Sequence, residues 1–135
     1  MGYRVDARSD VPPSRQIVEA VLDRVATGAL TPGDRLPSVR ALAEEALVNP
    51  NTVGKAYRDL ESMGVAEGRN GSGVFVTDGG PALAREARRR GTLATFRRAA
   101  LAALRAGHEA ESLRQAVVGI ETKEGARTAR SREEE

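Results

Sequence analysis

The sequence predicts a mostly α-helical protein that carries one small β-hairpin, and three observations lead to this fold class. Apolar residues recur at spacings of three and four over most of the 135 residues, which is typical of helices that bury one face. One pair of short β-prone runs flanks Asn70-Gly71, and Asn-Gly is the strongest short-range signal for a hairpin. Aromatic residues make up only 3% of the chain, so the core that joins these elements must be aliphatic.

The composition argues against several classes of function. The chain has no cysteine, which excludes disulfides, thiolate metal sites and cysteine nucleophiles. Its single histidine, His108, cannot form a histidine metal cluster by itself, and no phosphate loop or paired-carboxylate motif is visible. We therefore expect neither an enzyme nor a bound metal or cofactor. No apolar run approaches the roughly 20 residues of a membrane span, and no secretory signal is visible, so we expect a cytoplasmic protein without membrane contact.

The first helix is expected from Pro13 to about Thr27. Proline fits the first helical position, and an apolar stripe follows it. The members of this stripe are Ile17, Val18, Val21, Leu22 and Val25. Gly28 suits the left-handed position just past a helix end. The polar segment before the helix, residues 1–11, is expected to be loose.

A short second helix is expected from Val39 to Ala46. Before it, Thr31-Pro32-Gly33-Asp34 places proline and glycine where a type II turn prefers them. Ser38 directly precedes the helix and can cap its first turn. Leu47-Val48 follows the helix and is long enough only for a tight turn, so a further helix must pack against this one.

The third helix has the clearest start in the chain, because Asn49-Pro50 combines a capping side chain with a proline at the first helical position. An apolar stripe faces the core until Gly64 ends the helix. The members of this stripe are Val53, Ala56, Tyr57, Leu60 and Met63. The opposite face begins with Asn51, Thr52 and Lys55, which are side chains that suit base edges and phosphates in a DNA major groove. An ordinary solvated face is the alternative interpretation.

A hairpin follows the third helix directly, with β-prone runs at 65–68 and 74–76. A hairpin alone is marginal in water, so this one must pack on the helices. Two helices joined by a tight turn and followed by a hairpin form a winged helix-turn-helix domain. Arg69 and Ser72 at the tip are candidates for a minor-groove or phosphate contact, and a plain exposed turn is the alternative.

Two amphipathic helices are expected beyond the hairpin. A linker at 78–81 leads into a helix over 82–106 that Gly91 interrupts, and a last helix runs from about Glu109 to Glu121. These helices need a partner surface, and the same pair from a second chain supplies one. The alternative is that they fold back on their own winged domain. The candidate dimerisation residues are Leu93, Phe96, Ala100 and Leu104.

Three regions are therefore expected. They are a winged helix-turn-helix DNA-binding domain at 12–77, a helical dimerisation region at 81–121 and a disordered tail at 122–135.

The segment from Pro13 to Val76 resembles the N-terminal domain of the GntR family of bacterial transcription regulators. Five motifs in family order carry the resemblance: residues 32–40, 42–45, 48–53, 57–61 and 71–76. The short helical C-terminal part looks like the YtrA-type subfamily, whose members dimerise through two helices. The sequence departs from the family pattern at two positions. Leu47 stands where the family usually has the turn glycine, and Gly54 stands where many members have a larger polar or basic residue. A left-handed leucine would be strained, so the turn is expected to differ locally.

The resemblance also implies which residues contact DNA. Carried over from the family, they are Arg40, Asn49, Asn51, Thr52, Asn70 and Gly71. Further candidates from their position are Arg35, Ser38, Lys55 and Ser72.

We expect this protein to be a homodimeric, sequence-specific transcriptional regulator that binds a two-fold operator in double-stranded DNA, and we expect it to act as a repressor. The resemblance identifies neither the operator nor an effector ligand. An alternative is a nonspecific or architectural nucleic-acid-binding protein, because residues 77–107 hold seven arginines against two acidic residues. A third possibility is a winged helix used only for protein contacts.

Overall fold

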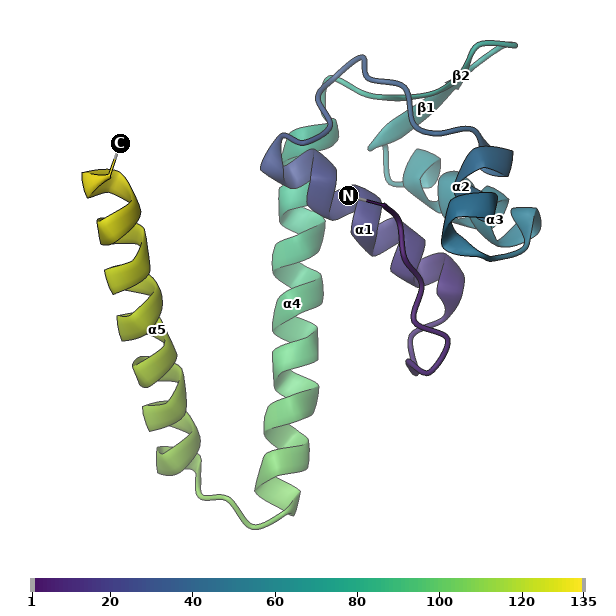
Figure 1. Cartoon of the computed structure of the whole chain (residues 1–135). Coiled ribbons are helices and arrows are strands. Elements are labelled where there is room, and N and C mark those ends of the chain that lie inside the picture. Colours follow the sequence, from purple (N-terminus) through teal and green to yellow (C-terminus); the bar gives the residue numbers. More distant parts are fainter. Residues whose placement is uncertain (1, 135) are drawn as a thin grey trace. The chain divides into compact units, whose positions relative to one another are not determined.

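The computed structural model describes residues 2–134 and has the expected mostly helical fold with one hairpin (Figure 1). The elements in chain order are α1 (Pro13–Thr27), α2 (Val39–Ala46), α3 (Pro50–Ser62), β1 (Ala66–Arg69), β2 (Gly73–Val76), α4 (Gly80–Arg105) and α5 (Ala110–Glu133). The chain divides into two compact units, one reaching to Gly91 and the other beginning at Thr92. No helix within residues 2–134 combines the length and apolar character needed to cross a membrane.

The expected starts and ends of α1, α2 and α3 are confirmed. The backbone N–H of Ala41 donates to Ser38 Oγ at 3.1 Å, which caps α2. The backbone N–H of Asn51 donates to Asn49 Oδ1 at 2.8 Å, which caps α3. Gly28, after α1, has a left-handed φ of 86°. The starts of α2 and α3 therefore follow from a side chain adjacent in sequence, whereas α1 begins at Pro13 without a side-chain cap.

The turn between α2 and α3 keeps the left-handed conformation, so the expected local difference at Leu47 is wrong. Leu47 has φ 56° and ψ 48°, and its backbone N–H donates to Ala43 O. It is the only non-glycine residue with positive φ in the described chain. Because only two residues connect the two packed helices, the backbone at Leu47 adopts the left-handed conformation although it is strained for leucine.

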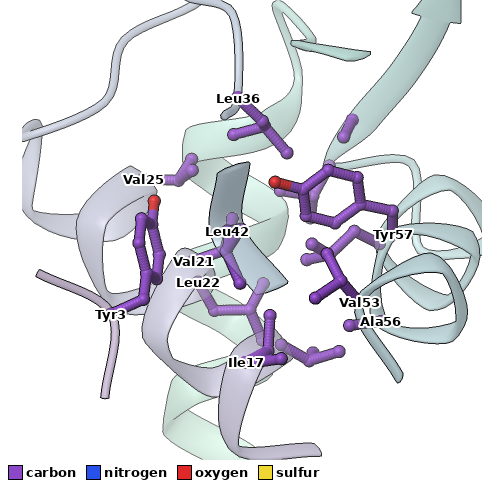
Figure 2. Close-up of a cluster of buried hydrophobic side chains, with 14 of the residues drawn as sticks. Tyr3, Ile17, Val21, Leu22, Val25, Leu36, Leu42, Val53, Ala56 and Tyr57 are labelled. Carbon is purple, nitrogen blue, oxygen red and sulfur yellow. The ribbon is translucent and has the colours of Figure 1, made fainter. Parts of the chain in front are cut away.

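The core of the first unit is the aliphatic cluster between α1, α2 and α3 (Figure 2). Fully buried members include Val18, Val21, Leu42, Val53 and Leu60, each 0% exposed. Figure 2 also shows the Tyr57 side chain extending from α3 toward the segment before α2. There its hydroxyl donates to Pro37 O at 2.6 Å. Burial raises the pKa of Tyr57, so the hydroxyl stays protonated and keeps donating this bond.

The hairpin is held by a third segment, residues 33–36: the sequence predicts that Arg35-Leu36 runs extended into Pro37, but it did not predict that this segment pairs with β2. β1 and β2 pair antiparallel with Arg69 opposite Gly73. Along the other edge of β2, Leu36 N donates to Val74 O at 2.8 Å and Val76 N donates to Asp34 O at 2.9 Å. The segment before α2 and the hairpin are therefore joined by backbone hydrogen bonds.

The N-terminal segment packs on the helices, so the expectation that this segment is loose is wrong for residues 2–11. Tyr3 is only 7% exposed and joins the core cluster. Its backbone N–H donates to Glu45 Oε1 at 3.0 Å, and the Arg24 guanidinium stacks on its ring at 3.9 Å. Gln16 donates to Asp6 O at 2.9 Å, which holds the segment on α1. Tyr3 supplies apolar surface for burial inside an otherwise polar segment.

The expected linker at 78–81 and the expected interruption at Gly91 are also wrong. Helix α4 already begins at Gly80 and continues through Gly91. Gly80 is buried, and a Cβ there would lie 2.9 Å from Val65 O. Ala84, one turn later, is 0% exposed. The Gly-Gly sequence thus allows a close approach between α4 and the end of α3 rather than marking a flexible joint.

Helix α5 runs to Glu133, well past the expected end near Glu121, so residues 122–133, which were expected to belong to a disordered tail, are helical, and residue 135 of that tail lies outside the described residues. The added turns contain pairs that stabilise a helix locally. Arg127 Nη2 lies 3.0 Å from Glu124 Oε2, three residues before it. Every described residue of these turns is exposed, so the extension rests on helix propensity and local pairs rather than on packing.

Candidate nucleic-acid interface

The first turn of α3 presents polar side chains to solvent. Asn51 and Lys55 are exposed, and Thr52 is half-buried. Lys55 Nζ lies 3.5 Å from Asp59 Oδ2, and an exposed pair of this kind is weak enough for a phosphate to replace the carboxylate. Asn49 uses its side-chain oxygen to cap the helix, so its amide group is the part that a nucleic acid can engage.

Arg40 stands on the first turn of α2 with a side chain 89% exposed. Its Nε lies 3.6 Å from Glu44 Oε1 on the next turn, an exposed ion pair that contributes little stability. The guanidinium is therefore able to leave Glu44 for a base edge or a phosphate. Ser38, two residues earlier, is exposed, but its hydroxyl oxygen already accepts the capping hydrogen bond.

Arg35 is fixed by the extended segment that pairs with β2. It forms a bridge with Phe75, and its side chain lies over Gly73, where a Cβ would come within 2.6 Å of Nε. Gly73 has φ 115°, so its backbone conformation favours a glycine there. The hairpin thereby determines where the backbone of Arg35 lies, a relation that no local sequence pattern revealed.

The hairpin tip exposes Asn70, Gly71 and Ser72, as the sequence predicts for a wing. Ser72 N donates to Arg69 O at 3.0 Å, and Gly71 has φ 70°, so the tip is a tight turn that needs glycine. Arg69 stacks on the Phe75 ring at 4.3 Å and pairs with Glu67. Both contacts hold Arg69 on the strands rather than at the tip.

Arg58 is a cation that the sequence interpretation missed. Gly54 stands where the family has a larger polar residue, and Arg58 Nη1 lies 3.5 Å from where a Cβ of residue 54 would be. Arg58 is exposed and lies seven residues after Asn51, on the same helix face. The missing side chain at Gly54 thus leaves room for a guanidinium, and the i, i+4 spacing could have indicated it.

The candidate dimerisation residues lie in the second unit with much of their apolar surface uncovered. Leu93, Phe96 and Leu104 on α4 are 48%, 50% and 45% exposed, and Ala100 is half-buried. On α5, Val118 and Ile120 are 52% and 63% exposed. An open hollow of about 350 Å³ is lined mainly by apolar side chains of both helices, among them Phe96, Leu104, Leu113 and Val117. Water-exposed apolar surface of this extent is typical of an interaction site.

Comparison with known proteins places these features in a family. Residues 13–76 match the family model described as bacterial regulatory proteins, gntR family. The transcriptional repressor YtrA of Bacillus subtilis is 41% identical over 75 residues, which cover 56% of this chain and 58% of YtrA. The match thus spans less than two thirds of that relative's length.

Solved structures extend the similarity to the C-terminal helices. YtrA of Sulfolobus acidocaldarius, a GntR-family transcription factor, is 31% identical with a TM-score of 0.56, covering 76% of this chain and 99% of that one. The DNA-binding domain of AraR in complex with operator ORX1 is 25% identical with a TM-score of 0.52, covering 56% of this chain and 96% of that one. The chain belongs to the GntR family of DNA-binding transcription regulators.

Proposed function

We propose that this protein is a homodimeric, sequence-specific repressor that occupies a two-fold operator in double-stranded DNA. The observation that carries the proposal is the combination of two surfaces. One is the set of exposed polar and basic side chains at the starts of α2 and α3, and the other is the uncovered apolar face of α4 and α5. The first suits a DNA groove and the second suits another copy of the same chain.

Base readout is assigned to the start of α3 together with Arg40. Asn51 and Thr52 supply hydrogen-bonding groups without net charge, as base edges require, and Arg40 can bind guanine with two parallel hydrogen bonds. Lys55 and Arg58 add positive charge along the same helix, where a phosphate strand borders the groove. Loss of Arg58 should lower the affinity for all DNA sequences alike. Loss of Arg40 should instead lower the preference for one base at a single position in each half-site.

Positioning on the phosphate backbone is assigned to Arg35, Ser38 and the tip residues 70–72. The backbone hydrogen bonds between residues 33–36 and β2 join the wing to the start of α2. Contacts made by the wing and by Arg35 are therefore expected to act together rather than independently. Asn49 contributes through its amide group while its oxygen keeps capping α3.

Dimerisation is assigned to the helices within 81–121, and DNA binding to 12–77. Each large apolar side chain that a second copy covers fully contributes about 1.5–3 kcal/mol. Leu93, Phe96 and Leu104 each have about half of that gain still available, since each is 45% to 50% exposed. Two linked domains then hold two half-sites with much greater affinity than one domain alone. Repression is supported by the name of the B. subtilis relative, a transcriptional repressor.

Selection of bound duplexes from a random DNA library tests the proposal. The expected result is an inverted repeat whose half-sites lie about 34–36 Å apart or a multiple of that distance. The selected duplex should retain the protein against excess scrambled duplex of the same length and salt. Enrichment of no sequence, with equal binding to scrambled DNA, would support the nonspecific alternative. No binding even at low salt would support a winged helix used only for protein contacts.

A further inference from the structure

A hollow of about 560 Å³ that opens widely to solvent, called the cavity below, lies in the first unit between the N-terminal segment and the residues that precede α2. It does not include the start of α3, and it shares Arg35 and the α2 cap residue Ser38 with the proposed DNA contacts. Its size falls in the range of small-molecule sites, which is about 300–1,000 Å³. A single backbone phosphate would leave most of this space empty.

Two guanidinium groups make the cavity suitable for an anion. Arg24 and Arg35 both line it, and none of the lining residues is acidic in the part of the chain that the structure describes. Arg24 is held by its stack on Tyr3 and by hydrogen bonds to Ala20 O at 3.2 Å and Gly2 O at 3.1 Å. The Arg35 side chain is exposed and lies beside Gly73. Because the Arg24 side chain is already ordered before binding, less conformational entropy is lost than for two mobile arginines.

The rest of the lining is apolar and suits an organic body attached to the anion. Leu36 is buried, and Leu30 and Pro37 are half-buried beside it. Tyr3 also lines the cavity and is 7% exposed. An inorganic anion would not use these surfaces.

We propose that this cavity binds a small organic phosphate monoester, and that occupancy lowers the affinity for operator DNA. A phosphate monoester offers three oxygens and nearly two negative charges, which suits two neighbouring guanidinium groups better than a carboxylate does. The second half of the proposal rests on the proposed function, because the bound phosphate would engage Arg35 and withdraw it from the DNA backbone. The DNA-binding domain would then contain both the DNA-contacting residues and the site of the ligand that regulates them.

Calorimetric titration of the full chain with phenyl phosphate tests binding without any DNA. We expect saturable binding, weaker binding of inorganic phosphate by about tenfold because the ring is missing, and no binding of phenol. Arg35→Gln should lower the affinity for phenyl phosphate by about tenfold or more, as expected for the loss of a charged hydrogen bond. Arg15→Gln, on the exposed side of α1 outside the lining, is the matched control and should bind normally.

Ala29 offers a second variant that leaves both arginines intact. It is exposed and lines the cavity, so Ala29→Asp should fold normally, place a negative charge beside the anion and abolish binding. Ala29→Asn has nearly the same shape without the charge and should retain binding. Absence of phenyl phosphate binding at millimolar concentration, or equal binding by Ala29→Asp and Ala29→Asn, would overturn the site.

A DNA titration shows whether the cavity binds a small molecule or instead binds a phosphate of the DNA backbone. With selected operator, saturating phenyl phosphate should weaken wild-type binding about tenfold or more and leave Ala29→Asp unchanged. Unchanged wild-type affinity would overturn the regulatory half. If Ala29→Asp loses operator and phenyl phosphate affinity to the same extent, the cavity holds a DNA phosphate and the proposal is wrong. Failure of the wild type to bind any DNA would refute the proposed function, while calorimetry would still decide the cavity.

Discussion

Replacement of Leu47 by glycine should stabilise the protein. Leu47 lies in the turn between α2 and α3 with φ 56°, and its side chain extends into solvent with 89% exposure. Removal of the side chain therefore sacrifices almost no buried apolar surface. What changes is the Cβ, which makes the left-handed conformation unfavourable for every residue except glycine.

Two opposing terms set the magnitude. Relief of the left-handed conformation contributes about 1–2 kcal/mol to the free energy of unfolding. The greater freedom of glycine in the unfolded chain removes roughly 0.5–1 kcal/mol of that gain. The two ranges leave a net stabilisation of about 0–1.5 kcal/mol, and the middle value of about 0.75 kcal/mol corresponds to a rise in Tm of about 3–6 °C for a domain of 60–100 residues.

Thermal unfolding followed by circular dichroism measures this effect, with all variants at one concentration because a dimer would make Tm concentration-dependent. Leu47→Ala is the control, since it removes the leucine side chain but keeps the Cβ, and it should leave Tm nearly unchanged. A Tm for Leu47→Gly at or below that of the wild type would refute the strain argument. Equal stabilisation by alanine would show that the exposed leucine, and not the backbone conformation, was unfavourable.

Four further substitutions test the other parts of the molecule. Arg40→Ala should weaken operator binding by about 1–3 kcal/mol and relax specificity at one position per half-site, measured against operator and scrambled DNA; unchanged affinity for both would remove Arg40 from the interface. Gly71→Val should weaken DNA binding in gel shifts while circular dichroism shows intact helices, because valine resists a φ of 70°; wild-type affinity would mean that the wing does not engage DNA. Phe96→Asp should convert a dimer to monomers in sedimentation and lower operator affinity by orders of magnitude, whereas a mutant that still sediments as a dimer would exclude this face. Tyr57→Phe should lower stability by about 1 kcal/mol, because it removes the donor to Pro37 O, and an unchanged denaturation midpoint would contradict this.

The local elements of the winged domain could be predicted because their signals lie within a few residues of each other. Ser38 and Asn49 each cap the helix that follows directly, and Gly28 ends the helix just before it. Such contacts depend on neighbouring residues alone, so a single sequence contains them. The candidate contacts on α3 followed from the same local pattern and remain predictions until DNA binding is measured.

The errors at Tyr3 and at the expected linker concern contacts between residues distant in sequence, whereas those at Leu47, at Gly91 and at the end of α5 concern local conformation. The docking of Tyr3 requires Arg24 and Glu45, which are 21 and 42 positions away. Composition alone could not show that Gly80 packs against Val65 rather than forming a linker.

The sequence by itself determined the order of helices and hairpin, the caps and the polar start of α3, because these depend on short-range hydrogen bonds and on apolar periodicity. Only the tertiary structure decided that residues 33–36 pair with β2 and that Arg35 lies over Gly73. It also decided that Arg24 and Arg35 line the same cavity. Backbone pairing between distant segments has no signal in the identity of the paired residues, since any residue but proline can donate the N–H and accept at the C=O.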